Sequence, residues 1–285
     1  MTAPPATPPP VTPPVTWLYV PGDRPDRFAK AAASGADVVI IDLEDAVAPA
    51  RKDEARAHAV AYLRGRPGDG AVHVRINDLA TPRGRDDLEA VGGLAGAVRL
   101  PKVEPGTPLE LVERLGARAY ALLESAAGIA GAREIAAHPS VAGVALGEQD
   151  LAAELSITDE GAMNHLRMRV VLAAAAAGLP PVPMSVYPDV RDEAGLLASC
   201  AAGRGMGLFG RTAIHPRQIP VIRRAFRPGE EETARAAEIV RAAEEAEAAG
   251  AGAVALPDGR FVDAPIVARA RRTLELAARL RDDLP

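Results

Sequence analysis

Residues 119–150 read AYALLESAAGIAGAREIAAHPSVAGVALGEQD: an apolar run that ends at Glu124, a helix-length segment, and a second apolar run that ends shortly before Asp150. A strand, a helix and a second strand in this order form a parallel crossover unit. In a barrel of such units, the strand ends of one face line a single mouth. Two carboxylates at that mouth, with few other ligands, favour a hard divalent ion such as Mg²⁺ and a metal-assisted enzyme that acts on an oxyanionic substrate.

Glu124 and Asp150, each considered alone, could have a simpler role at the start of a helix. Glu124 and Asp150 both precede or begin segments of helical character. A carboxylate in such a position is typical of a helix N-cap or of a first-turn charge. The occurrence of both acids after strand-like runs favours the metal site over two separate caps.

The same alternation runs through most of the chain and predicts an α/β fold. Eight units in this length fit a TIM (β/α)₈ barrel better than a doubly wound sheet, and no strand is followed by the Gly-x-Gly-x-x-Gly fingerprint in its required setting. The predicted strands are 16–20, 38–42, 72–76, 98–101, 119–123, 141–146, 182–186 and one within 206–214. The predicted barrel helices are 25–34, 52–63, 129–137, 163–177 and 193–202.

Three regions follow from the composition along the chain. Residues 1–15 are rich in Pro, Thr and Ala and are expected to form a disordered leader. Residues 16–228 are assigned to the barrel. Residues 229–285 form a C-terminal helical and hairpin extension, which caps its own barrel or reaches a neighbouring subunit. Its predicted elements are a helix at 230–249, a hairpin at 254–262 with its turn at Pro257-Asp258-Gly259, and an amphipathic helix at 265–280.

Composition narrows the class of protein. The chain has 285 residues, of which 48% are hydrophobic, and a net charge of −5, so nothing indicates binding to nucleic acid or to an anionic membrane. No apolar run approaches the roughly 20 residues of a membrane helix, and the N-terminus lacks the pattern of a signal peptide. We therefore expect a cytoplasmic protein. The single cysteine, Cys200, excludes an intramolecular disulfide and is expected to be a small buried hydrophobe.

Charged residues near two other strand ends are further candidates. Arg75 shares a strand face with His73, and a guanidinium on an inward face is a good bidentate partner for a carboxylate ligand. An outward Arg75 paired with a helix acid is the alternative. Asp42, Glu44 and Asp45 lie at the end of the strand at 38–42, where they could order metal-bound water, tune nearby arginines, or cap the next helix.

Lys102 and His215 complete the candidates at strand ends. Lys102, in Leu100-Pro-Lys, invites a Schiff-base aldolase mechanism, but an acidic mouth would keep its amine charged, so a structural ion pair is the favoured role. His215 lies before Pro216 at the start of a helix that follows the last strand. A ligand contact and simple capping fit His215 equally well.

Seven motifs in register resemble the citrate lyase β-subunit family, which also contains malyl-CoA and citramalyl-CoA lyases. The resemblance runs from about Trp17 to the final helix. The motifs are Leu18-Tyr-Val-Pro-Gly-Asp-Arg-Pro-Asp-Arg-Phe, Val39-Ile-Ile-Asp-Leu-Glu-Asp-Ala-Val, Val74-Arg-Ile-Asn, Leu100-Pro-Lys, Leu123-Glu-Ser, Gly147-Glu-Gln-Asp-Leu and Gly207-Leu-Phe-Gly-Arg-Thr-Ala-Ile-His-Pro-Arg-Gln-Ile.

The resemblance implies a TIM barrel in a trimer or a trimer-based oligomer, with Mg²⁺ at the mouth. Glu124 and Asp150 match the family's metal-binding carboxylates. Arg75 matches the arginine that holds the oxygens of the keto acid. Arg24 matches a position near the thioester carrier. Asp263 matches a tail aspartate that CoA lyases of this family project into a neighbouring subunit's site as an acid/base.

The substrate carboxylate is expected on the backbone of Gly147, Glu148 and Gln149, again by resemblance. Gln149 departs from the family, because many relatives carry an acid before the metal aspartate. This change would alter the net charge near the metal without removing a ligand.

The predicted function is Mg²⁺-dependent cleavage of a citryl, citramalyl or malyl thioester to a keto acid and an acetyl thioester, or the reverse condensation. The expected partners are an acyl thioester of CoA or of a carrier protein, and a keto acid, bound by a homotrimer. Asp263 in the tail favours a stand-alone enzyme that uses free CoA. The alternatives are a Schiff-base aldolase that uses Lys102, and a non-catalytic or partner-dependent subunit that binds the same ligands.

Overall fold

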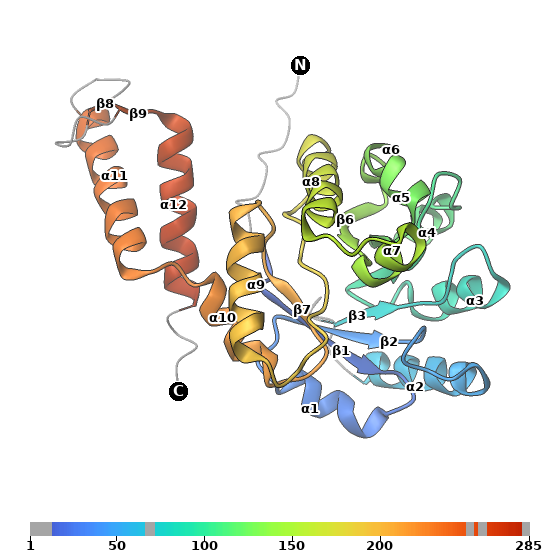
Figure 1. The fold of residues 1–285 in the computed structure, drawn as a ribbon. Coiled ribbons are helices and arrows are strands. Elements are labelled where there is room, and N and C mark those ends of the chain that lie inside the picture. The colour runs from blue at the N-terminus through green and yellow to red at the C-terminus, as the bar shows by residue number, and fades with distance from the viewer. Residues whose placement is uncertain (1–12, 66–71, 249–253, 256–260, 281–285) are drawn as a thin grey trace, which may run out of the picture. The chain divides into compact units, whose positions relative to one another are not determined.

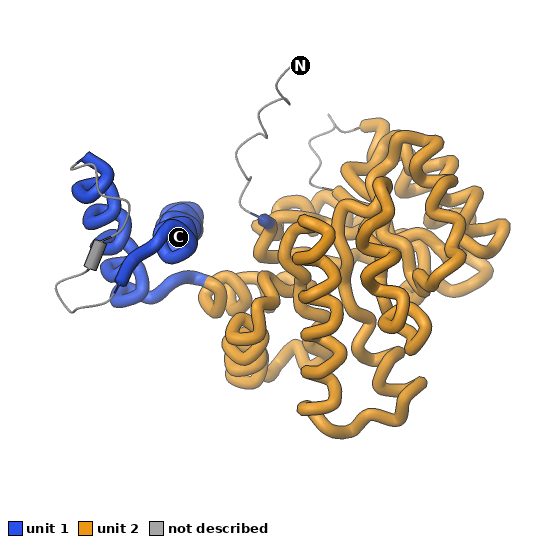
Figure 2. The backbone as a smooth tube through the Cα atoms, turned by 90° about the horizontal axis from the view of Figure 1, so that it is seen from above, with its two compact units in different colours: residues 1–13, 227–285 blue, residues 14–226 orange. Residues whose placement is uncertain are grey.

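The computed structural model describes residues 13–65, 72–248, 254–255 and 261–280. The chain divides into two compact units (Figure 2). One comprises residues 14–226 and the other comprises residues 227–285 together with 1–13. Most of the predicted leader, residues 1–12, lies outside the described residues.

The larger unit is built on a curled, seven-stranded parallel sheet with helices along its outer face (Figure 1). The strand order is β6-β5-β4-β3-β2-β1-β7. Seven of the eight predicted strands are confirmed: β1 Thr16–Pro21, β2 Val38–Asp42, β3 Val72–Arg75, β4 Ala97–Leu100, β5 Ala119–Leu123, β6 Val141–Leu146 and β7 Arg211–Ala213.

The predicted strand at 182–186 is the exception. It contributes a single bridge, between Met184 and Arg211, and runs beside β7 without forming a strand of its own. Pro183 lies inside this run and Pro181 precedes it. Each proline lacks a backbone N–H and cannot donate to a ladder, so this segment cannot pair continuously.

The helices follow the strands as the alternation predicts. Helices α10, α1 and α8 pack against β1, β2 and β6 respectively. The elements are η1 Pro25–Arg27, α1 Phe28–Ala32, η2 Pro49–Arg51, α2 Lys52–Arg64, α3 Pro82–Val91, α4 Glu110–Arg114, α5 Ala126–Ala130, α6 Ala132–Ala136, α7 Glu148–Leu155, α8 Glu160–Ala176, α9 Glu193–Gly205 and α10 Gln218–Phe226.

The helix predicted at 129–137 is two short helices, α5 and α6, which meet at Gly131. A Cβ at this position would lie 2.3 Å from Cγ of Pro105. Glycine therefore allows the chain to turn between the helices while it passes close to the Pro105 ring. This contact joins residues far apart in sequence, so the local pattern did not indicate the break.

The first strand begins at Thr16 as predicted, and the residue before it is already packed. Val15 is fully buried, and its N–H donates to Oδ2 of Asp37 over 2.7 Å. Its carbonyl accepts from the backbone N–H of Arg211. Val15 is therefore ordered against the sheet although it precedes β1, because Asp37 and β7 satisfy its backbone groups.

The smaller unit consists of α11 (Glu230–Ala248), the antiparallel strands β8 (Val254–Ala255) and β9 (Phe261–Val262), and α12 (Ala264–Arg279). Both predicted helices and the pairing of the predicted hairpin are confirmed. The predicted turn at Pro257-Asp258-Gly259 lies outside the described residues. No helix in the described part of the chain combines the length and the apolar character that a membrane crossing requires.

We expect Gly143→Ala to destabilise the larger unit by roughly 1–3 kcal/mol, since the added methyl overpacks the sheet interior. Gly143 is in register with Tyr120, and its Cβ would lie 2.4 Å from Cε1 of the tyrosine ring. Urea unfolding measures the effect. Gly205→Ala is the matched control, because its Cβ meets nothing within 4 Å. Equal stability of the two variants would contradict the packing argument.

Candidate functional site

A cavity of about 680 Å³ opens at the carboxyl ends of the parallel strands. Side chains that follow or end different strands line it, together with the start of α7. This is the edge at which open and closed α/β sheets bind their ligands. The charged residues that line it are Asp42, Asp45, Arg75, Arg99, Glu124, Glu148, Asp150, Asp159, Glu160, Arg167 and Arg211.

The two predicted metal ligands line this same cavity. Glu124 directly follows β5 and is 7% exposed, and its Oε1 accepts from the backbone N–H of Lys102 over 2.8 Å. Ser125, not Glu124, caps α5. Asp150 lies exposed in the first turn of α7, which has no side-chain cap. Neither acid is therefore used as an N-cap, although Asp150 remains a first-turn charge.

The position of Glu124 disfavours the charged form of its carboxylate. Burial, followed by the nearby Glu44 and Asp150 carboxylates, raises the pKa of Glu124 to about 7. Burial likewise raises the pKa of Glu44. A divalent cation between Glu124 and Asp150 would relieve this repulsion, so the donor set fits a hard ion of the Mg²⁺ type.

Protein side chains alone would not fill the coordination sphere of such an ion. Within the described ranges, no three His, Cys, Asp or Glu side chains gather closely enough to hold a metal by themselves. Two carboxylates leave several positions for water and for substrate oxygens. That is the usual arrangement where Mg²⁺ acts on a bound anionic substrate.

Gly147 allows Glu124 to take its position. A Cβ on Gly147 would lie 2.4 Å from Cβ of Glu124 and 2.5 Å from its Oε2. Gly147 also begins the turn into α7, where the first backbone N–H groups of a helix have no intrahelical acceptors. Gly147, Glu148 and Gln149 all line the cavity, as the predicted carboxylate cradle requires.

The side chain of Glu148 is held by Arg167, whose Nε donates to Oε1 of Glu148 over 2.9 Å. Arg167 also binds Glu160 and Asn164, and it is itself buried. This ion pair ties α7 to α8. Because the ion pair occupies the side chain of Glu148, the group that Glu148 can offer to a ligand is its backbone N–H.

Arg75 faces the cavity and is bound by strand-end acids. Its Nε and Nη2 donate to the two carboxylate oxygens of Asp42 over 2.7 and 2.6 Å, and its Nη1 lies 2.9 Å from Glu44 and 3.1 Å from Asp45. Its guanidinium stacks 4.9 Å from the centre of the Tyr19 ring. The outward alternative for Arg75 is wrong. Such a bidentate pair fixes the direction of the guanidinium.

The acids after β2 serve two of the predicted purposes. Asp42 accepts from the backbone N–H groups of Glu44 and Ala46, so it organises the turn, and the same carboxylate binds Arg75. Glu44 is shared between Arg75 and Lys102. The third predicted purpose, ordering of metal-bound water, stays a prediction.

Lys102 forms the predicted ion pair, with Nζ 3.3 Å from Oε1 of Glu44. Burial alone would lower the pKa of Lys102, but Glu44 outweighs it and the pKa is raised. Its φ of 55° is in the left-handed region, which costs a non-glycine residue on the order of 1 kcal/mol and here presents its N–H to Glu124. A raised pKa disfavours imine formation, because the amine must first lose its proton.

Two predicted ligand contacts are not among the residues that line the cavity. Arg24 follows β1, is exposed, and pairs with Asp26 over 3.1 Å. His215 is exposed, and its Nδ1 accepts from the backbone N–H of Arg217 over 3.1 Å, just before α10 begins at Gln218. A role for either residue therefore depends on the part of a ligand that extends beyond the cavity.

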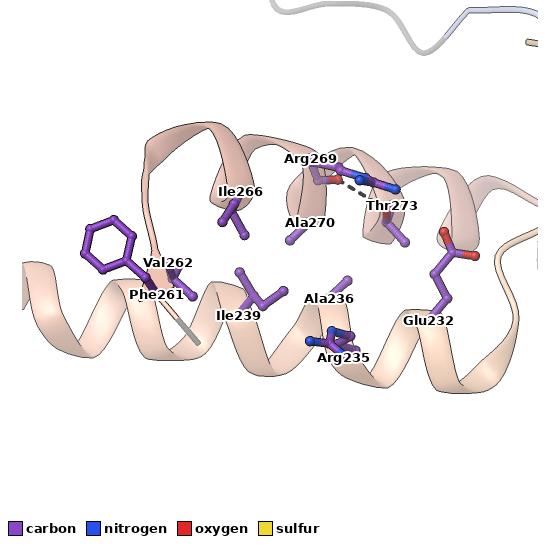
Figure 3. A pocket seen from close by; sticks show the side chains of 10 residues that line it. All are labelled: Glu232, Arg235, Ala236, Ile239, Phe261, Val262, Ile266, Arg269, Ala270 and Thr273. Carbon is purple, nitrogen blue, oxygen red and sulfur yellow. Dashed lines mark hydrogen bonds between the residues drawn. The ribbon is translucent and has the colours of Figure 1, made fainter. Parts of the chain in front are cut away.

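Asp263 belongs to the smaller unit, where it caps α12 by accepting from the N–H of Ile266. Beside it, α11 and α12 enclose a largely apolar pocket of about 320 Å³ (Figure 3). Val262 and Ile266 flank Asp263 and face Ile239 across this pocket. The acid/base role of Asp263 stays a prediction.

The sequence pattern of the HpcH/HpaI aldolase/citrate lyase family matches residues 16–216. The chain belongs to this family.

Similar proteins in this family cover nearly the whole chain. A (3S)-malyl-CoA thioesterase from Cereibacter sphaeroides is 40% identical over 267 residues, which make up 91% of this chain and 93% of that protein. CitE from Mycobacterium tuberculosis, solved with magnesium, acetoacetate and coenzyme A, has a TM-score of 0.78 at 38% identity and covers 93% of this chain and 98% of its own. A citrate lyase β subunit from the same organism, solved with oxaloacetate and magnesium, has a TM-score of 0.66 at 39% identity, with coverage of 75% and 97%.

Several cavity residues were missed from the sequence. Arg99 and Tyr19 lie within strands, Arg211 begins β7, and Arg167 lies in α8. Arg99 had a usable signal, because it is a lone charge in the otherwise apolar strand Ala97–Leu100. Because side chains alternate between the two faces of a strand, Arg99 could have been assigned to the inward face in the same way as Arg75.

The raised pKa of Glu124 predicts how stability depends on pH in metal-free protein. Between pH 4.5, the usual value for a glutamate, and about 7, folded Glu124 keeps a proton that the unfolded chain has lost. The free energy of unfolding should therefore fall as the pH rises through this window, by on the order of 3 kcal/mol from this group. Urea unfolding with chelator at about pH 5 and about pH 8 measures the fall.

Glu124→Gln should remove this part of the slope, because a glutamine does not titrate. Glu113→Gln, at an exposed position on α4, is the control and should keep the wild-type slope. The same slope in all three proteins would show that Glu124 titrates normally.

Proposed function

We propose that this protein is an Mg²⁺-dependent carbon–carbon lyase that cleaves a citryl, citramalyl or malyl thioester to a keto acid and an acetyl thioester, or runs the reverse condensation. The observation that carries the proposal is that Glu124 and Asp150, two acids that do not serve as helix N-caps, line the same cavity as Arg75, whose guanidinium is held by Asp42. The solved relatives that contain magnesium with acetoacetate and coenzyme A, or with oxaloacetate, support it.

Each residue has a separate task in this reaction. Glu124 and Asp150 would hold the ion, which when bound supplies a positive charge that acidifies the substrate hydroxyl. Arg75, held in direction by Asp42, would add fixed positive charge beside the hydroxyl oxygen as that oxygen loses its proton, before the negative charge passes to the departing thioester enolate. The backbone N–H groups at the start of α7 would hold the substrate carboxylate.

Cleavage removes one proton from the substrate hydroxyl and must return one to the departing enolate, whose CH2 carbon then becomes the acetyl methyl. We assign this proton transfer to Asp263, contributed by a neighbouring subunit of a homotrimer. We also propose that the sheet completes a TIM (β/α)₈ barrel, with residues 182–186 in the place between β6 and β7. Support comes from the bridge of Met184 to β7 and from Ser185, whose hydroxyl donates to the carbonyl of Leu146 at the end of β6.

Thioester hydrolysis is the second candidate. The Cereibacter sphaeroides relative, at 40% identity, is a (3S)-malyl-CoA thioesterase. The same cavity could then activate water against the thioester carbonyl. The two reactions differ in their products, because hydrolysis keeps the hydroxy acid whole and releases free CoA, whereas cleavage releases a keto acid and acetyl-CoA.

Purified protein should cleave one of citryl-CoA, citramalyl-CoA and malyl-CoA with Mg²⁺ and lose this activity with excess chelator. Product analysis by chromatography separates lyase from thioesterase chemistry. Glu124→Gln and Asp150→Asn should each lower kcat/KM by roughly 100-fold or more, because each removes a charge that would hold the ion. Glu113→Gln should match the wild type. Full activity in either cavity variant would overturn the metal-site assignment.

A binding subunit without turnover makes a different prediction. It would bind oxaloacetate or pyruvate in the presence of Mg²⁺ and would leave all three thioesters intact. That result would redirect the assay to carrier-protein thioesters with partner subunits.

Lys102 should form no covalent adduct with a keto acid. Its ion pair with Glu44 keeps the amine charged, so imine formation is disfavoured. Borohydride treatment with pyruvate, followed by intact-protein mass measurement, tests this directly. An added mass that disappears in Lys102→Arg would establish the aldolase alternative instead.

A further inference from the structure

Arg99 is a buried cation with an incomplete set of partners. It lies on β4 and is 1% exposed, yet its Nε and Nη2 have no hydrogen-bond partner among the described residues. Its guanidinium lies 5.3 Å from the centre of the Tyr120 ring and 5.9 Å from that of Trp17. Aromatic faces attract a cation, but they accept none of its directed N–H groups.

The acids nearby are already committed to other cations. Asp42 holds both ends of the Arg75 fork, and Glu44 is divided between Arg75 and Lys102. Arg99 forms no ion pair with any residue of the described ranges. A buried charge without a counter-charge is costly, so a protein retains one where a ligand supplies the opposite charge.

A donor on a ring beside Arg99 also lacks an acceptor in the described part of the chain. The indole Nε1 of Trp17 and the Nδ1 of His73 are also buried without hydrogen-bond partners among the described residues. Burial, followed by the charges of Arg99 and Arg118, lowers the pKa of His73 to about 3, so the ring is neutral. The Nε and Nη2 of Arg99 and the indole N–H of Trp17 are therefore donors that meet no acceptor among the described residues, which favours a small anion over a cation.

Arg99 forms part of the floor of the functional cavity. It is one of the residues that line the cavity, along with Tyr19 and Leu122. It is in direct register with Arg75 on the neighbouring strand, so the two side chains leave the sheet on the same face. The Arg99 guanidinium, whose Nε and Nη2 meet no acceptor among the described residues, thus lies next to the arginine assigned to the keto-acid oxygens.

We propose that Arg99 is a specificity-determining residue that binds a second carboxylate of the substrate. This inference rests on the proposed lyase function. With the keto and first carboxylate groups held at Arg75, Glu124 and Asp150, a carboxymethyl arm on the carbinol carbon would extend to Arg99. The citryl group carries that arm, whereas the malyl group has a hydrogen there and the citramalyl group has a methyl. Arg99 therefore selects a keto acid with a carboxylate at each end.

The test compares binding of fresh oxaloacetate and of pyruvate by calorimetry, with Mg²⁺ and with chelator. The two keto acids differ only in the second carboxylate. Wild-type protein should bind oxaloacetate roughly tenfold or more tightly than pyruvate, because a hydrogen bond to a charged group contributes that much. The comparison needs no variant, so it stands even if a substitution at Arg99 disturbs folding.

Arg99→Met should abolish this preference and bring the affinity for oxaloacetate down to that for pyruvate. Arg99→Lys should keep part of it, because the charge remains and the fork is lost. Arg118→Met, at an exposed arginine before β5, is the matched control and should keep the wild-type preference. Arg99→Met should also raise the melting temperature of ligand-free protein, since it removes an uncompensated buried charge.

Two kinds of result would overturn the proposal: one refutes only the role of Arg99, and the other refutes the lyase function as well. Equal binding of oxaloacetate and pyruvate by wild type, or an unchanged preference in Arg99→Met, would refute the role of Arg99 and leave the lyase function standing. Failure of wild-type protein to bind either keto acid with Mg²⁺ would refute the lyase function together with the inference.

Discussion

The bidentate pair between Arg75 and Asp42 is the interaction on which the site depends. Asp42 ends β2 and Arg75 ends β3, and the parallel register places them side by side at the mouth. Asp42 also accepts two backbone N–H groups of the turn that carries Glu44. One carboxylate therefore fixes both the arginine and the loop, and through Glu44 it fixes the position of Lys102.

Concentration of charge at one edge is the cost of this architecture. Parallel strands bring all their carboxyl ends together, so Glu124, Glu44 and Asp150 repel one another in a partly dry cavity. Arg75 and Lys102 offset part of that repulsion. Burial, followed by the neighbouring Glu44 and Asp150 carboxylates, raises the pKa of Glu124, and a divalent cation between Glu124 and Asp150 would offset this repulsion.

Close packing of backbone against side chains positions these charges. Gly147 leaves room for the Glu124 carboxylate, and Gly143 leaves room for the Tyr120 ring that lies against Arg99. Both glycines lie on or directly after β6, whose neighbour β5 carries Tyr120 and precedes Glu124. The pairing of these two strands therefore shapes both the mouth of the cavity and its floor.

The sequence by itself determined the order of strands and helices, the placement of Glu124, Asp150 and Arg75 near strand ends, and the family. These features are local, because alternation, turn residues and motif spacing are legible within a few residues. The tertiary structure alone decided that the acids which bind Arg75 are Asp42 and Glu44 and that the acid which binds Lys102 is Glu44. It also decided that Arg99 is buried with two donors that meet no acceptor in the described part of the chain. These contacts depend on the register between strands that are distant in the chain. They also depend on prolines and glycines, whose effect is set by the residues packed against them in the folded protein.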